Sequence, residues 1–336
     1  MRLDTVRTPR WTRRRFLGGL VSAAGVLAVA PARAFTPRVG TADIAPRRVA
    51  QLVVPRRTRV GEVFDIRRTL PGPGVEQVDP FLMLDHFDFP IAKGQLGGLA
   101  PHPHRGFETV TVLLDGAIEH GDSLGNRGLL EPGGVQWMTA GAGIVHEENP
   151  ADVLRERGGR VRGVQLWVNL PARAKMTPPA YQDTPFARVP TYSEAGVTAR
   201  VFAGAAHDVT AVIGTHTPMA LIDYGLAPGA ELVLDWPPAW SAFVHVVDGL
   251  VDVGGARVAE AHLAVLTGGS GLYVQNPGPR PARLLVGGGE PIAEPVARYG
   301  PFTMNTQAEL QVAVDDYRSG RMGRVANPTY ERIRLR

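Results

Sequence analysis

The sequence of 336 residues contains no cysteine. This absence excludes disulfide bonds, a lipid-modified cysteine and thiolate chemistry, so the fold must be stabilised by a hydrophobic core. A long hydrophobic segment is also missing. The apolar run at residues 18–30 is shorter than the roughly 20 residues that a membrane span requires, and we therefore expect no stable membrane anchor.

The N-terminal segment nevertheless has the features of an export signal. Residues 12–17 contain three consecutive arginines followed by Phe and Leu, the apolar run comes next, and residues 32–34 read Ala-Arg-Ala, a cleavage pattern. This order resembles a twin-arginine signal peptide. We expect residues 1–34 to be this signal, residues 35–46 to be a linker, and the mature protein to be periplasmic or secreted.

The mature chain has no large excess of either charge. The whole sequence has 36 Lys and Arg against 32 Asp and Glu, but residues 1–34 hold seven arginines and one acid. The remainder therefore has 29 basic and 31 acidic residues, a formal net charge of −2. The excess of basic residues in the whole sequence comes from the signal, so it is no argument for nucleic-acid binding. We expect a monomer that does not bind nucleic acid.

Glycine and proline are abundant, with 40 and 29 residues. They separate short alternating or β-branched runs such as residues 107–114 and 163–168, a pattern typical of an all-β barrel or sandwich. The run at residues 107–114 is followed by Asp-Gly, and the same arrangement recurs at residues 242–249. This recurrence indicates a duplicated barrel.

A proline-rich stretch near residues 171–190 predicts a connection between two domains. We place the N-terminal domain at residues 47–178 and the C-terminal domain at residues 179–336. Near the end of the chain the apolar positions change to helical spacing and a glycine follows them. The pattern predicts one substantial helix at about 305–320, docked on a barrel as a cap.

Only nine histidines are present, but three of them lie in two short motifs. His102 and His104 are two residues apart, and His146 and Glu148 have the same spacing about forty residues later. Residues i and i+2 of a strand point to one face, so two facing strands can place three imidazoles and a carboxylate around one metal ion. These four residues are the candidate metal ligands.

Several stretches resemble the pirin family of the cupin superfamily: residues 102–108, 136–148, 300–305 and 316–320. The resemblance implies a bicupin fold, in which two β-barrels stand in tandem with one non-haem iron in the N-terminal barrel. Carried over by position, it implies that the iron ligands are His102, His104, His146 and Glu148.

The resemblance also implies an activity. Some pirins are quercetinases, which cleave the central ring of flavonols with O2 and release carbon monoxide, whereas others are iron-dependent transcriptional cofactors in animal nuclei. We expect a quercetin 2,3-dioxygenase-type reaction on a flavonol-like phenolic substrate. The alternative is a non-catalytic iron-binding sensor or partner-binding protein of the cell envelope, since export argues against a transcriptional role.

The ligand set suits a divalent first-row ion. Fe(II) is the expected metal, and Mn, Ni, Cu and Co remain open. A substrate oxygen and O2 could bind side by side if the four protein ligands left two adjacent positions free. In this hypothesis Glu148 is also the general base that removes the proton of the flavonol 3-hydroxyl.

Neighbouring residues leave alternatives open. Glu147 lies beside Glu148, but strand parity points it away from His146. Glu108 has the expected parity of His102 and His104, so it remains an alternative carboxylate ligand or an acid that supports a ligand. Arg105 is predicted either to orient a phenolate or to form a salt bridge with Glu108.

Four further residues have weaker signals. His86 is a candidate for supporting a ligand, and Trp137 and Met138 either line the pocket or belong to the core. His245 has no partner two residues on, because Val247 occupies that position. The second barrel is therefore predicted to be metal-free.

Overall fold

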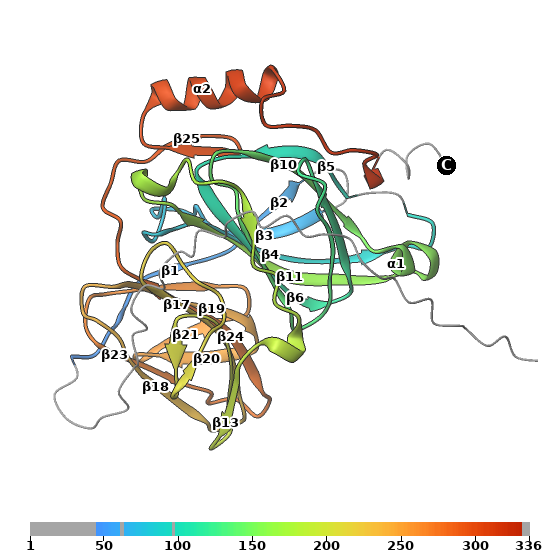
Figure 1. The fold of residues 1–336 in the computed structure, drawn as a ribbon. Helices are drawn as coiled ribbons and strands as arrows, with labels where there is room; N and C mark the ends of the chain where they lie inside the picture. The colour runs from blue at the N-terminus through green and yellow to red at the C-terminus, as the bar shows by residue number, and fades with distance from the viewer. Residues whose placement is uncertain (1–44, 61–63, 96–97, 331–336) are drawn as a thin grey trace, which may run out of the picture. The chain divides into compact units, whose positions relative to one another are not determined.

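The computed structural model describes residues 45–60, 64–95 and 98–330. The predicted signal peptide and most of the predicted linker lie outside these residues and stay predictions. The described chain forms two barrels of antiparallel strands followed by a C-terminal helix (Figure 1). The prediction of an all-β, two-barrel fold with a terminal helix is confirmed.

The first barrel consists of a seven-stranded and a four-stranded sheet. The larger sheet contains, in order, β12 (Ala180–Tyr181), β9 (Val135–Thr139), β6 (Phe107–Asp115), β11 (Gly159–Asn169), β4 (Phe81–Ile91), β3 (Phe64–Leu70) and β2 (Arg56–Val60). The smaller sheet contains β5 (Leu99–His104), β10 (Ile144–Pro150), β7 (Ile118–Asp122) and β8 (Arg127–Leu130).

The second barrel repeats this plan. Its larger sheet contains β1 (Val49–Val53), β22 (Leu263–Leu266), β19 (Ser241–Asp248), β24 (Ala282–Gly289), β17 (Met219–Leu226), β14 (Val197–Ala203) and β13 (Thr191–Glu194). Its smaller sheet contains β18 (Glu231–Asp235), β23 (Gly271–Gln275), β20 (Leu250–Val253) and β21 (Ala256–Ala259). Strands β6 and β19 occupy the third position of their sheets and both lead into Asp-Gly, which confirms the repeat seen in the sequence.

Short elements complete the described chain. They are α1 (Asp152–Arg157), the 3-10 helices η1 (Ala172–Ala174) and η2 (Phe186–Arg188), the hairpins β15 (Ala205–Ala206) with β16 (Val209–Thr210) and β25 (Ala297–Tyr299) with β26 (Phe302–Met304), and α2 (Gln307–Arg318). Helix α2 begins with a capping box between Thr306 and Glu309. Within the described residues, no helix is both long and apolar enough to cross a membrane.

The two seven-stranded sheets share a core. In β11 the even-numbered residues Val164, Leu166 and Val168 belong to a cluster that includes Leu221 and Phe243 of the second barrel. The odd-numbered residues of β11 point to the other face, because side chains alternate along a strand. That face is the interior of the first barrel, where the candidate site lies.

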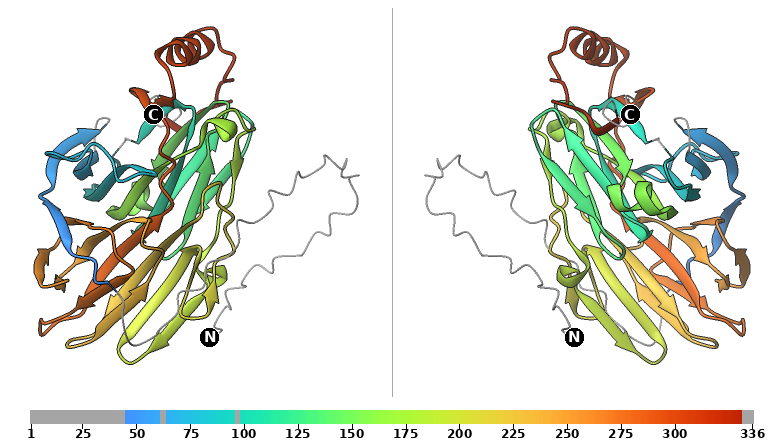
Figure 2. Two further views of the ribbon diagram at one scale, coloured as in Figure 1. Left: turned by 90° about the vertical axis from the view of Figure 1, so that its left-hand side faces the viewer. Right: turned by 90° about the vertical axis from the view of Figure 1, so that its right-hand side faces the viewer.

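The two ends of the described chain exchange barrels. Residues 47–53 lie in the range predicted for the first barrel, yet β1 pairs with β22 of the second. The segment from β25 to α2 lies in the range predicted for the second barrel, yet it lies against the first (Figures 1 and 2). Val145 of β10 shares a hydrophobic cluster with Phe302 and Leu310 of this segment. The sequence did not reveal either exchange, because alternation specifies which face of a strand is buried and not which strand lies beside it.

Candidate metal centre

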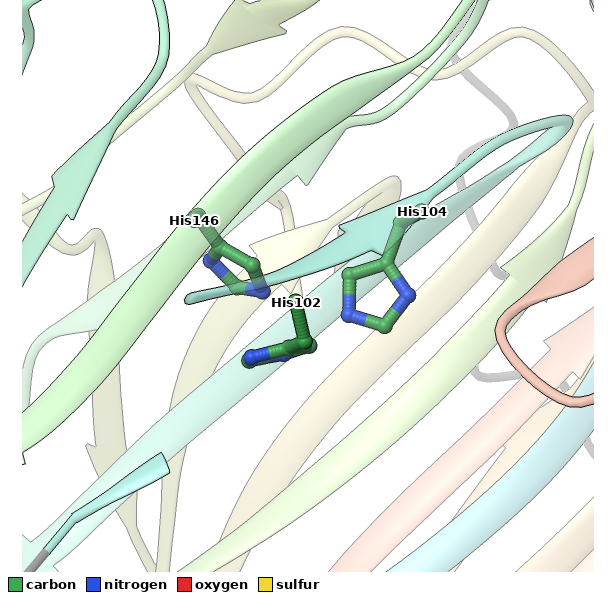
Figure 3. Close-up of side chains that lie close together, drawn as sticks. All are labelled: His102, His104 and His146. Carbon is green, nitrogen blue, oxygen red and sulfur yellow. The ribbon is translucent and has the colours of Figure 1, made fainter. Parts of the chain in front are cut away.

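Three histidines converge inside the first barrel. His102 and His104 lie on β5, and His146 of β10 is directly opposite His102 in the antiparallel ladder. Their rings point toward one another (Figure 3), with nitrogen atoms within 4.8 Å of each other across the group. The ring centroids are 4.4–4.9 Å apart. The predicted i, i+2 geometry therefore brings the three imidazoles to one point.

The electrostatics of the group suit metal binding. Burial, and then the neighbouring imidazoles, hold the pKa of His104 and of His146 well below the usual value of 6.5. Both rings are therefore neutral at neutral pH, the form that binds a metal. Both nitrogens of His146 and Nδ1 of His104 are buried without a hydrogen-bond partner. Such unpartnered nitrogen atoms, and the donor set itself, fit a divalent first-row ion.

Glu148 follows His146 by two residues on β10 but is not one of the residues whose ligand atoms lie within 4.8 Å of one another. Its carboxylate accepts hydrogen bonds of 3.2 and 3.4 Å from the Nε2 of Gln165, and the β5–β10 register shifts between His146 and Glu148. Glu148 as fourth ligand and base therefore stays a prediction. Gln165 was not predicted from the sequence, because its only signal is its odd, inward position on β11 between Gly163 and Trp167.

Glu108, the alternative ligand, does not keep the predicted parity of His102 and His104, because Val110 and Val112 on its face of β6 belong to the core between the barrels. Strand β5 ends at His104, and the chain turns through Arg105 and Gly106, whose φ is +87°, before β6 begins. Parity is not transmitted through such a turn. The Glu108 carboxylate instead accepts a 2.7 Å hydrogen bond from Thr139 Oγ1.

The residues beside the ligands contact the C-terminal segment. Glu147 points away from His146, as parity predicts, and accepts hydrogen bonds from the backbone N–H groups of Thr329 and Tyr330. Arg105 does not form the salt bridge with Glu108 that was one of its expected contacts, because its guanidinium is paired with Asp316 at 2.7 Å.

The remaining candidates lie outside the histidine group. His86 is 3.4 Å from His245 of the second barrel, between Nδ1 and Nε2, so it does not support a ligand. Trp137 belongs to the core between the barrels, and Met138 packs with Ala140 and Ile144.

A small cavity lies beside Glu148. Its volume is about 50 Å³, far less than the roughly 300–1,000 Å³ of typical pockets that enclose a small molecule. Most of its wall is apolar, and its polar residues are Asp85, Thr111, Glu148, Asn149 and Gln165. The apolar part includes Phe64, Ile66, Phe87, Leu99, Ile118 and Val161.

Both barrels match models of a known protein family. Residues 63–168 match the Pirin family, and residues 221–323 match the Pirin C-terminal cupin domain. The chain belongs to the pirin family. The pirin-like protein of Solanum lycopersicum is 40% identical over 281 residues, which are 83% of this chain and 94% of the relative. The resemblance predicted from the motifs is thus confirmed.

Two pirin-fold relatives are described as quercetin dioxygenases. A candidate quercetin 2,3-dioxygenase of Pseudomonas aeruginosa is 41% identical over 264 residues, covering 76% of this chain and 90% of the relative. The crystal structure of quercetin 2,3-dioxygenase from Acinetobacter baumannii superimposes with a TM-score of 0.79 at 34% identity, covering 84% of this chain and 100% of that one. The histidine group thus lies in a fold shared with these relatives.

Proposed function

We propose that this pirin is a metal-dependent dioxygenase that cleaves flavonol-like phenolics with O2, a reaction of the quercetin 2,3-dioxygenase type. The observation that carries the proposal is the group of three converging histidines, in which burial keeps His104 and His146 neutral, with Glu148 two residues beyond His146. The relatives described as quercetin dioxygenases support the same chemistry.

In this proposal each residue has a defined role. His102, His104 and His146 hold the metal, with Glu148 as the fourth ligand. When bound, Fe(II), or one of Mn, Ni, Cu and Co, supplies Lewis acidity toward oxygen ligands. Glu148 accepts the proton of the substrate 3-hydroxyl, and Gln165 orients the Glu148 carboxylate through its amide.

The test is anaerobic purification of the mature protein, metal analysis, and O2 uptake with quercetin. A double variant, His102→Ala with His104→Ala, is measured in parallel. Uptake that requires the metal and disappears in the double variant supports the dioxygenase. One bound metal per chain with no uptake would contradict it.

The cavity gives a reason to keep a second function, an iron-binding sensor or partner-binding protein without turnover. At about 50 Å³ it encloses no flavonol, so the enzyme requires the substrate to bind at the cavity entrance or the barrel to open. Protection of Phe64 and Leu99 peptides from hydrogen exchange by quercetin would favour the enzyme. Metal binding without such protection would favour the sensor.

We also propose that the protein is exported by the twin-arginine pathway and works as a monomer outside the cytoplasm, without nucleic acid. The support is the sequence order of residues 12–34 and the net charge of −2 that remains after them. N-terminal sequencing of the protein from a periplasmic fraction should start at residue 35. Replacing Arg13, Arg14 and Arg15 with lysine should leave the protein in the cytoplasm.

A further inference from the structure

The C-terminal segment, defined here as residues 297–330, lies against the backbone that carries the metal ligands. The bridge between Phe302 and Arg105 is parallel, and the N–H of Thr303 donates to the Arg105 carbonyl at 3.1 Å. On the neighbouring strand, Val145 is in one hydrophobic cluster with Phe302 and Leu310. The segment therefore contacts the residues next to both His104 and His146.

On the β5 side the contact is made by Arg105, which directly follows His104 and is 4% exposed. Its Nε donates to the Ala142 carbonyl and its Nη2 to Asp316 Oδ2, each at 2.7 Å. One planar guanidinium thus joins the end of β5, the turn before β10 and helix α2. Arginine suits this role because its donors form a rigid fork.

Lys175 and Gly106 reinforce the contact between the end of β5 and the C-terminal segment. Lys175 Nζ donates to the carbonyls of Gly106 and Thr303, at 2.8 and 3.1 Å. A Cβ atom at Gly106 would lie 1.9 Å from the Thr303 oxygen, so the hairpin after His104 approaches the segment as closely as a glycine allows.

On the β10 side the contact is made by Glu147, which is fully buried between His146 and Glu148 in the sequence. Its Oε1 accepts from the N–H of Thr329 at 2.7 Å, and its Oε2 from the N–H of Tyr330 at 3.1 Å. The second acid of this motif thus binds the C-terminal segment from the face opposite to the histidines.

We infer that Arg105 and Glu147 are positioning residues, through which the C-terminal segment holds the two ligand-bearing strands at the spacing that the metal requires. The inference rests on the metal centre of the proposed function and does not depend on the reaction. Groups that orient ligands from behind typically contribute 10–100-fold to metal affinity. Because coupling between two sites is reciprocal, metal binding must also stabilise the docked segment.

The test uses the full mature chain, purified without metal and titrated with Ni(II) alone. Asp316→Asn weakens the contact with Arg105, and Glu147→Gln replaces one of its two acceptor oxygens by an amide donor. Asp315→Asn is the matched control, since Asp315 lies on the same helix and its side chain accepts from Gln311. We expect each of the first two variants to bind nickel about tenfold more weakly, and the control to bind within twofold of the wild type.

Hydrogen exchange supplies the readout that a merely structural role would not change. Nickel should slow exchange at residues 301–304 and 322–330 of the wild type, and this protection should shrink in Glu147→Gln by the factor lost in nickel affinity. Circular dichroism of the metal-free variants checks that they fold. If Asp316→Asn does not fold, Arg105→Lys tests the same contact between Arg105 and Asp316.

Two results would overturn the inference. Variants that bind nickel as tightly as the wild type, while their C-terminal segments exchange faster, would show that the segment only packs on the barrel. A folded wild type that binds no nickel would remove the metal centre and the inference with it. Neither quercetin nor O2 is present, so absence of dioxygenase activity cannot be mistaken for either result.

Discussion

Glu148 and Glu108 are buried carboxyl groups of the first barrel that lie in different surroundings. Glu148 accepts hydrogen bonds from Gln165 beside the histidines, whereas Glu108 lies among residues between the barrels. Burial raises the pKa of Glu108 to about 7. His216, whose Nε2 is 3.9 Å from the Glu108 Oε1, is kept neutral by burial, which lowers its pKa, and so does not offset the charge.

Replacing Glu148 with Gln tests its role as base. The amide can still coordinate through oxygen but cannot accept the substrate proton, so quercetin turnover should fall about 100-fold or more while metal content falls by no more than a few-fold. Oxygen uptake and metal analysis on one preparation measure both. Glu131→Gln, an exposed acid of the same barrel, is the control. Equal loss of metal and rate would leave Glu148 as a ligand only.

Replacing Glu108 with Gln tests its burial. A carboxyl whose folded pKa is raised from 4.5 to about 7 stabilises the fold fully below pH 4.5, and this stabilisation is lost as pH rises through 7. The amide stays neutral at all these pH values. The difference in unfolding free energy between Glu108→Gln and the wild type should therefore shift in favour of the variant by up to about 3 kcal/mol from pH 5 to pH 8. Denaturant unfolding at both pH values measures it. A difference independent of pH would contradict the buried acid.

At the scale of elements, the turn between β5 and β6 links the ligands to the rest of the barrel. Lys175 is buried beneath it and donates to three oxygen atoms, those of Gly106, Thr303 and the Asn169 side chain. None of these acceptors is charged. Burial lowers the pKa of Lys175 to about 8, because no carboxylate is paired with the ammonium group.

Replacing Lys175 with Met should change how stability depends on alkaline pH. A lysine whose folded pKa is lowered from 10.5 to about 8 contributes stability that is present above pH 10.5 and is lost as pH falls through 8. Relative to Lys175→Met, the unfolding free energy of the wild type should therefore increase by up to about 3 kcal/mol from pH 8 to pH 10.5. Urea unfolding across this range is the measurement, with the exposed Lys93→Met as control. A difference in unfolding free energy that does not change with pH would show that burial does not lower the pKa of Lys175.

Element prediction from the sequence succeeded where the pattern was local. The run at residues 107–114 is β6, and the helix expected at about 305–320 is α2, from Gln307 to Arg318. The i, i+2 rule also brought His102 and His104 to one face. It failed for Glu108, because a turn with a positive φ at Gly106 resets the alternation between two strands that look continuous in the sequence.

At the scale of the whole described chain, the partners of its two ends could not be predicted. Arg47 is fully buried and donates to the carbonyls of Pro237, Trp240 and Thr267, which fixes the strand that follows it in the second barrel. These contacts span about 190 to 220 residues of sequence, and no local periodicity encodes such pairings. Together with the shared core, they favour unfolding of both barrels as one cooperative unit.

Phe243 allows this cooperativity to be tested. It is fully buried between the two seven-stranded sheets, and its ring meets that of Phe81 edge to face with centroids 5.0 Å apart. Truncating a buried Phe to Ala typically lowers the free energy of unfolding by about 3–5 kcal/mol.

If the barrels unfold together, Phe243→Ala should speed hydrogen exchange in β6 and β11 of the first barrel as much as in β19, where the substitution lies. Val244→Ala is the matched control for strand position, because Val244 belongs to the core inside the second barrel. Faster exchange in β19, with wild-type rates in β6 and β11, would show that the two barrels unfold independently.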